Sequence, residues 1–286
     1  MKVLVTGATG HFGGMVVNHL LNQMDVKDIV ISVRDPKKAS AFADKGIEVR
    51  HGDFDLPETL PVAFEGIDRV LIVSTDLDNE TRIRQHLAAV KALKAAGVKH
   101  VIYTSVADAP NSTLSLAEVH RQTEKAILES GLTYTFLRNN WYLENETSSI
   151  QAASNGAPWV TSAQEGKVGW TLKREYAEAA AIALASEGHD NKIYELSNHP
   201  QTQETLAAIV GKVLGREIPV LQVSDSAYAE GLKAAGLPDF LVEMFTDIQK
   251  SIREGALDVV SSDFEKLLGR APLSLESAVA ELVKGL

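Results

Sequence analysis

The fold prediction rests on the stretch Thr6-Gly7-Ala8-Thr9-Gly10-His11-Phe12-Gly13 near the start of the chain. It follows a short apolar run, Lys2–Thr6, and opens a segment with helical periodicity, His11–Met24. Glycines at this spacing permit a tight turn and let the backbone approach a pyrophosphate, which then lies at the free N–H groups of the helix. Between a first strand and a first helix, the pattern predicts a dinucleotide site formed by residues 7–13. The alternative is a Gly-rich turn that binds nothing.

The first half of the chain alternates short β-branched runs with helical segments, as expected of β-α-β units around a parallel sheet. Gly97 and Gly131 stand where a glycine ends a helix before the next strand. The sequence predicts an α/β fold with a doubly wound Rossmann-type parallel sheet. We expect strands near Lys2–Thr6, Asp28–Val33, Ile47–His51, Arg69–Ser74, His100–Ser105 and Leu132–Leu137, and helices near His11–Met24, Pro36–Lys45, Asn79–Ala96 and Leu116–Ser130.

The end of the second strand predicts which dinucleotide binds, because an acidic residue there ordinarily accepts the ribose 2′-hydroxyl of NAD. Arg34 occupies that place, and a guanidinium pairs bidentately with a 2′-phosphate. Lys38, or Lys37 beside it, adds a second positive charge. Asp35 precedes Pro36 and is expected to cap the following helix. The sequence therefore favours NADP(H) over NAD; the alternative is a solvated basic loop.

Polar residues follow three further strands and are expected to line the same crevice, because ligands bind beyond the carboxyl ends of parallel strands. Asp53 follows the third strand, where it either contacts the adenine or stabilises a turn. Ser74, Thr75 and Asp76 follow the fourth strand and are expected to border the nicotinamide half. Ser105 closes the fifth strand and either hydrogen-bonds the ligand or satisfies nearby backbone.

The regular alternation of strands and helices breaks after about Leu143. A helix near Lys173–Ala185 and a strand near Lys192–Leu196 are expected to rejoin the main sheet, and a further strand is expected at Ile218–Val223. We therefore expect an NADP-binding Rossmann domain over 1–150, rejoined by about 168–200. Residues 151–167 and 201–286 would form a smaller, mostly helical domain that caps the substrate; the alternative is that these helices only complete the core.

Composition excludes several classes of protein. The 286 residues carry 28 basic and 38 acidic side chains, a net charge of −10 that argues against binding nucleic acid. With no Cys, disulfides and thiolate sites are absent. No apolar run reaches about 18 residues, and no secretory h-region follows Met1, so we expect a cytoplasmic protein without membrane insertion. The sequence is compatible with a homodimer.

Together with the glycine pattern and Arg34, the segment Leu137-Arg138-Asn139-Asn140-Trp141-Tyr142-Leu143-Glu144-Asn145 resembles the NmrA-like, atypical short-chain dehydrogenase/reductase family. Within it, the chain is most similar to bacterial NADPH-dependent quinone oxidoreductases of the second type. The resemblance implies that Gly7 to Phe12 hold the pyrophosphate, that Arg34 holds the 2′-phosphate, and that Ser74 to Asp76 pass the nicotinamide half. It also implies cofactor contacts by Asn139, Asn140, Trp141, Tyr142, Glu144 and Trp170.

The chain lacks the acid–base pair of ordinary short-chain reductases. That pair is Tyr-x-x-x-Lys, in which the lysine lowers the tyrosine pKa so that the phenol passes a proton near neutral pH. None of the six tyrosines has Lys four residues further on. A reduced quinone needs less acid assistance than an alkoxide, because it is a phenolate whose conjugate acid has a pKa of about 10, like tyrosine. The sequence predicts an NADPH-dependent reductase of quinones or similar conjugated acceptors.

Two residues are candidates for protonating or orienting the acceptor. His120 could donate a proton, because its unperturbed pKa of about 6.5 suits the task; the alternative is a helix histidine paired with Glu124. Asn139 is expected to orient the acceptor or the nicotinamide through its amide. Trp141 and Tyr142 form either an aromatic wall for a flat quinone or part of the core.

Other activities compete with the reductase prediction. The main rival is a non-catalytic NADP-binding redox sensor like the NmrA-like regulators, which would use the same dinucleotide site. A nucleotide-sugar epimerase would also be expected to carry a Tyr-x-x-x-Lys pair, which this chain lacks, so this activity is disfavoured. Neither a His-x-x-x-His pair, nor a phosphate-binding P-loop, nor a Gly-x-Ser-x-Gly elbow occurs, so no metal site and no hydrolase chemistry is predicted.

Overall fold

The computed structural model describes residues 1–286, built around a seven-stranded sheet in the order β3-β2-β1-β4-β5-β6-β9. Every neighbouring pair of strands runs parallel. The strands are β1 (Val3–Thr6), β2 (Ile29–Val33), β3 (Glu48–His51), β4 (Arg69–Ile72), β5 (His100–Val106), β6 (Thr133–Asn139) and β9 (Lys192–Leu196). The predicted doubly wound sheet is confirmed, including the late strand that rejoins it beside β6.

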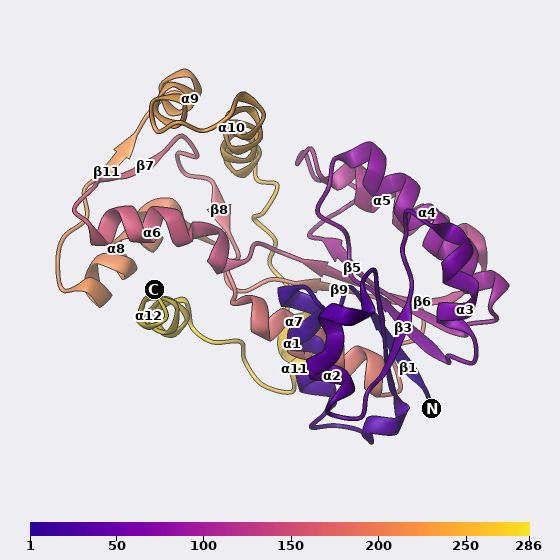
Figure 1. Cartoon of the computed structure of the whole chain (residues 1–286). Helices are drawn as coiled ribbons and strands as arrows, with labels where there is room; N and C mark the ends of the chain where they lie inside the picture. The colour runs from indigo at the N-terminus through magenta and orange to yellow at the C-terminus, as the bar shows by residue number, and fades with distance from the viewer.

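Helices cover both faces of the sheet (Figure 1). One face carries α1 (His11–Leu20), α7 (Lys173–Ala185) and α11 (Asp263–Leu268); the other carries α3 (Leu60–Phe64), α4 (Asn79–Ala95) and α5 (Ala117–Ser130). Side chains of one strand divide between these faces: Val3 and Val5 join the core under α1 and α7, whereas Leu4 joins the opposite core. Short helical segments fill the connections: η1 (Val26–Asp28), η2 (Pro36–Ala39), α2 (Ser40–Ala43), η3 (Pro57–Thr59) and η4 (Leu143–Glu146).

The strand order changes direction at β1, which pairs with β2 on one side and with β4 on the other. The Thr6 hydroxyl joins the ends of β1 and β4: it donates to the Leu71 carbonyl at 3.1 Å and accepts from the Val73 N–H at 3.0 Å. In open α/β sheets this reversal leaves a crevice outside the carboxyl ends of the strands. The fold therefore places this crevice beside Thr6.

The remaining elements pack around a separate apolar core and form the left-hand lobe of Figure 1. They are α6 (Thr147–Ser154), α8 (Gln203–Leu214), α9 (Asp225–Ala234), α10 (Asp239–Arg253) and α12 (Leu275–Lys284), together with β7 (Trp159–Thr161), β8 (Lys167–Val168), β10 (Gln201–Thr202) and β11 (Val220–Gln222). Strand β7 pairs with β11 in parallel, and β8 pairs with β10 antiparallel. Every helix of the protein is too short or too polar to span a bilayer.

Three local features differ from the sequence-based expectations. Helix α6 lies in a Ser/Thr-rich stretch after Leu143 where only a break in the regular alternation was expected; it forms because Ile150 and Ala153 pack into the second core and outweigh the weak helix propensity of the stretch. The helix expected over Pro36–Lys45 is a 3₁₀ turn followed by a short α-helix. Residues 263–268, expected in the smaller domain, lie on the sheet side instead, because the Phe264 ring stacks on Tyr176 with centroids 5.0 Å apart.

Candidate functional site

A cavity of about 590 Å³ lies beyond the carboxyl ends of β1, β2 and β4. It extends from the glycine turn after β1 to Tyr142 and Lys173 at the border with the second lobe. Twelve of the residues proposed from the sequence line it: Gly7, Thr9, Gly10, His11, Phe12, Gly13, Arg34, Asp53, Ser74, Thr75, Asp76 and Tyr142. The fold thus gathers residues that follow four strands, β1, β2, β3 and β4, around one space.

The turn between β1 and α1 needs its glycines for geometric reasons. Gly7 has φ +63°, in the left-handed region that side chains disfavour. A Cβ on Gly13 would lie 2.5 Å from the Gly7 carbonyl oxygen, so only glycine lets the helix approach the turn. Gly10 caps α1 without a side-chain acceptor, which leaves the first N–H groups of the helix free. This cradle of backbone donors fits a pyrophosphate.

Arg34 stands at the end of β2, exposed at the mouth of the cavity and without an ion-pair partner. A free guanidinium here fits a second phosphate group.

Asp35 accepts from the Lys37 N–H at 3.0 Å and caps the next turn, as expected. Asp53 accepts from the Asp55 N–H at 2.9 Å, so its turn-stabilising role is present while the residue also lines the cavity.

The loop after β4 is held against the cavity by two buried side chains. The Thr75 N–H donates to Nε2 of His86 at 3.1 Å, and the Ser74 N–H donates to Oγ1 of Thr104 at 2.9 Å. Thr123 donates its hydroxyl to the Val119 carbonyl, so Nδ1 of His86 must be the donor in its 2.9 Å contact with Thr123. Burial, followed by the charge of Arg82, lowers the His86 pKa to about 3. The imidazole is therefore a neutral acceptor for this loop.

His120 lies behind the cavity in a buried polar cluster. Its Nδ1 is 2.8 Å from the Tyr103 phenol oxygen, and its Nε2 is 3.4 Å from Nη2 of Arg82. Burial and the nearby Arg82 charge hold the His120 pKa well below its usual value. Burial raises the Tyr103 pKa. Neither group is poised to exchange a proton near neutral pH.

The pairing of His120 with Glu124 considered from the sequence does not form. Glu124 instead receives Nη2 and Nε of Arg138 at 2.7 and 3.0 Å, and the Ser105 hydroxyl donates to it at 2.6 Å. A forked arginine is a stronger partner for a buried carboxylate than a histidine whose pKa is depressed. Ser105 is thereby committed to Glu124 and does not line the cavity.

Nine residues proposed from the sequence do not line the cavity: Ala8, Lys38, Ser105, His120, Asn139, Asn140, Trp141, Glu144 and Trp170. Most of the polar side chains among them form hydrogen bonds with other residues of the chain. The Asn140 amide donates to Oγ of Ser197 and to the Leu257 carbonyl, both at 3.0 Å, and Glu144 accepts the Lys173 N–H at the start of α7.

Asn139 is linked to the cavity through Tyr142. Its Nδ2 donates to the Tyr142 phenol oxygen at 3.2 Å, while its Oδ1 is buried without a partner. The Tyr142 ring stacks on Phe12, with centroids 6.1 Å apart, and carries the ammonium of Lys173 over its face at 5.3 Å. Burial raises the Tyr142 pKa to about 12. One end of the cavity is therefore aromatic and holds a phenol that stays neutral.

Sequence reasoning missed several cavity residues. They are Thr6, Ser32, Val33, Gly52, Phe54, Val73, Leu77, Arg82, Gln85, Thr104 and Lys173. Arg82 and Gln85 lie in the N-terminal half of α4 and do not directly follow a strand, so only their i, i+3 spacing on one helix face could have drawn attention to them. No group of three His, Asp or Glu side chains lies close enough together to hold a metal ion.

Comparison with known proteins gives a consistent result over nearly the whole chain. The family model of the NmrA-like family matches residues 1–269. Quinone oxidoreductase 2 of Escherichia coli K12 is 37% identical over 98% of both chains. The crystal structure of the E. coli NADPH-dependent quinone oxidoreductase complexed with NADPH superposes with a TM-score of 0.95 at 36% identity, covering 99% of this chain and 100% of that one.

A second solved structure, the Citrobacter sp. triphenylmethane reductase complexed with NADP(H), superposes with a TM-score of 0.94 at 38% identity and covers 99% of this chain and 100% of that one. A match of this extent includes the glycine turn, the whole sheet and the second lobe. The chain belongs to the NmrA-like family.

Proposed function

We propose that this protein is an NADPH-dependent reductase that passes hydride to a quinone or a similar conjugated acceptor. The observation that carries the proposal is the cavity at the reversal of strand order, with free backbone donors at one end and an unpaired Arg34 at its mouth. The relatives complexed with NADP(H) and NADPH support the choice of cofactor.

The residues present fit NADPH along the length of the cavity. The N–H groups at the start of α1 would hold the pyrophosphate, and Arg34 would hold the 2′-phosphate. Ser74 and Thr75, fixed by Thr104 and His86, would lie along the nicotinamide half. Bound there, the cofactor supplies the hydride, while the protein supplies orientation and keeps water out.

The protein's own groups suit an acceptor that needs little acid assistance. Tyr142, the phenol on the cavity wall, has a pKa of about 12, and the pKa of His120 is lowered well below neutrality. Neither gives up a proton readily at pH 7. The oxyanion of a reduced quinone has a conjugate acid with a pKa of about 10, so water can protonate it after hydride transfer. Asn139 would orient the acceptor indirectly, by holding the Tyr142 phenol.

The test is oxidation of NADPH by the purified protein with a panel of benzoquinones and naphthoquinones, beside NADH and a cofactor-binding titration. We expect turnover with a preference for NADPH. Tight NADPH binding without turnover across the panel would contradict the reductase and favour a sensor of cofactor state, which needs the same dinucleotide site but no acceptor.

A further inference from the structure

Arg82 of α4 is a buried cation that lines the cavity and has no countercharge. Only 9% of its surface is exposed. The guanidinium has one polar contact, from Nη2 to Nε2 of His120 at 3.4 Å, and its Nε has no partner. The His120 imidazole is neutral and compensates no charge. A buried charge without a partner is costly, so its presence in the cavity wall points to a role in ligand binding.

The carboxylates around Arg82 do not neutralise it. Glu124, on the neighbouring helix α5, is bound by Nη2 of Arg138 at 2.7 Å. Asp76 lines the same cavity and its charge acts on Arg82, but the two side chains form no ion pair and Asp76 is exposed to solvent. The positive charge of Arg82 is therefore free to act on a ligand that fills the cavity.

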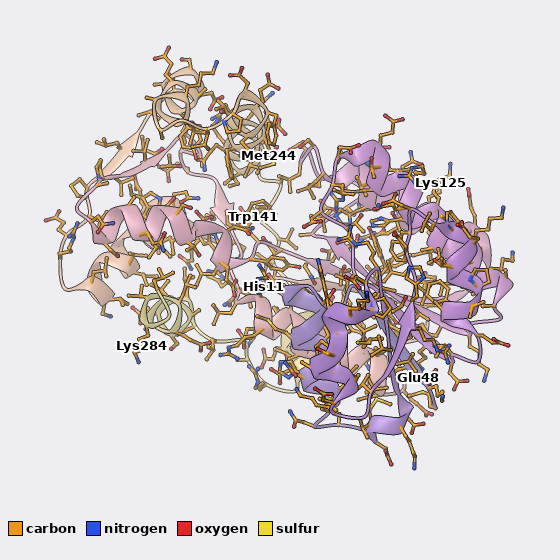
Figure 2. The ribbon with its side chains drawn as sticks, in the orientation of Figure 1. His11, Glu48, Lys125, Trp141, Met244 and Lys284 are labelled. Atoms are coloured by element: carbon orange, nitrogen blue, oxygen red, sulfur yellow. The ribbon has the colours of Figure 1, made fainter.

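Arg82 reaches the cavity from the face of the sheet opposite to the glycine turn. Figure 2 shows His11 at the start of α1 and Lys125 of α5 on opposite sides of the strands. Bound to the first N–H groups of α1, the pyrophosphate would lie on the α1 side. Arg82 lies instead behind the loop after β4, because His86, one helical turn further on, accepts the Thr75 N–H at 3.1 Å. In the proposed function this loop runs along the nicotinamide half.

The oxidised and reduced cofactors differ in charge at the nicotinamide ring. The ring is neutral in NADPH and carries one positive charge in NADP⁺, whereas the phosphates are the same in both. A fixed cation beside this half of the cavity therefore opposes binding of NADP⁺ and has little effect on NADPH. Because Arg82 is buried, salt screens its charge less than the charge of an exposed arginine such as Arg34.

We propose that Arg82 makes the site select NADPH over NADP⁺, and that its charge promotes the release of NADP⁺ after hydride transfer. The inference rests on the proposed function and names the residue that sets the preference between the two redox states. Arg34 cannot set it, because the 2′-phosphate that it would bind is present in both states. When hydride leaves for the acceptor, the ring becomes a cation, and its repulsion by Arg82 weakens binding of the product.

The test is calorimetric titration of the purified protein with NADPH and, separately, with NADP⁺, in the absence of any acceptor. Arg82→Gln removes the charge and Arg82→Lys keeps it. Lys91→Gln is the control, because Lys91 lies on the same helix, is exposed and unpaired, and its loss changes the net charge equally. The ratio of the NADP⁺ to the NADPH dissociation constant should fall about tenfold in Arg82→Gln, as expected for one charge at an effective dielectric constant of about 20. In Arg82→Lys and Lys91→Gln it should stay near the wild-type value.

A purely structural role for Arg82 would affect both forms of the cofactor alike. An equal loss of affinity for NADPH and NADP⁺ in Arg82→Gln would overturn the proposal, and so would a ratio that falls as far in Arg82→Lys as in Arg82→Gln. Urea unfolding first establishes that each variant is folded. Arg82→Met, which removes the charge and fills the space with an apolar chain, replaces Arg82→Gln if the latter does not fold.

Quinone turnover separates this inference from the reductase itself. A ratio that falls in Arg82→Gln, when neither protein reduces any quinone, would refute the reductase and leave the selection by Arg82 standing, as a sensor of cofactor state requires. Turnover with NADPH that NADP⁺ inhibits to the same extent in the wild type and in Arg82→Gln would leave the reductase standing and refute the role of Arg82.

Discussion

The phenol oxygen of Tyr103 lies 2.8 Å from Nδ1 of His120, and both side chains are buried behind the cavity at the strand ends. Arg82 faces the other ring nitrogen of His120, and its charge adds to burial in keeping the imidazole neutral. A histidine in this state has no proton to give at pH 7. Its role is structural: it contacts the Tyr103 phenol and links α5 to Arg82 of α4.

We therefore expect His120→Asn to leave the shape of the pH–rate profile unchanged between pH 6 and pH 8. Any loss of turnover should be a uniform factor, because the residue is not ionising in this range. The measurement is kcat/KM for NADPH oxidation by a benzoquinone across the series. An inflection near pH 6.5 that is present in the wild type and missing from the variant would restore His120 as the proton donor.

The fold was predictable from the sequence because its signals are local and agree with one another. Apolar runs, the glycine turn and the stop signals Gly97 and Gly131, whose φ values are +73° and +76°, each specify one element. The lining of the cavity was predictable where it lies at strand ends. Arg82 and Lys173 were not predicted because their positions at the cavity depend on how α4 and α7 pack. The partner of Glu124 on α5 was not predicted because Arg138 comes from strand β6.

His86 should make the protein sensitive to acid. Its pKa is about 3 in the folded protein and about 6.5 in an unfolded chain, so the unfolded state binds more protons between these values and stability falls as pH falls. Lowering the pH from 7.5 to 5 should cost about 2 kcal/mol through this residue alone. In His86→Gln, which can still accept the Thr75 N–H, that part of the loss should vanish. Urea unfolding at both pH values measures it; equal losses in both proteins would show that His86 is protonated without unfolding.

Arg34 should decide between NADPH and NADH. Its guanidinium is exposed and pairs with nothing in the protein, so Arg34→Ala should leave the free energy of unfolding nearly unchanged. The ratio of NADH to NADPH dissociation constants should fall by about 10- to 100-fold, as expected for a lost charge-assisted pair. Lys37→Ala removes an equal charge three residues away and should leave most of the preference intact. An unaltered ratio in Arg34→Ala would exclude this arginine from binding the 2′-phosphate.

Gly13 should be intolerant of any side chain. Its Cβ would meet the backbone of Gly7 at 2.5 and 2.8 Å, where nothing flexible can move aside. Gly13→Ala should lower the free energy of unfolding by about 1–3 kcal/mol and weaken NADPH binding, because the turn must shift. Gly14→Ala is the matched control: its nearest contact is 3.3 Å, and alanine favours the helix. Denaturant unfolding and NADPH titration of both variants test this, and equal behaviour would mean that the turn adapts.

Asn139 should act on the acceptor only through Tyr142. The single hydrogen bond between them, 3.2 Å from Nδ2 to the phenol oxygen, fixes the direction of a ring that also contacts Phe12 and Lys173. Asn139→Ala and Tyr142→Phe should each lower kcat with the quinone by about tenfold, a loss typical of a missing orienting contact. Both variants should weaken NADPH binding much less.

If the two residues form one unit, the double variant should be no slower than either single variant, giving a coupling energy of about 1 kcal/mol in the double-mutant cycle. Kinetics of the four proteins, after unfolding has shown that all are folded, provide the measurement. Strictly additive losses would mean that the Asn139 amide reaches the ligand by itself, and its unpaired Oδ1 would then be the atom that does so.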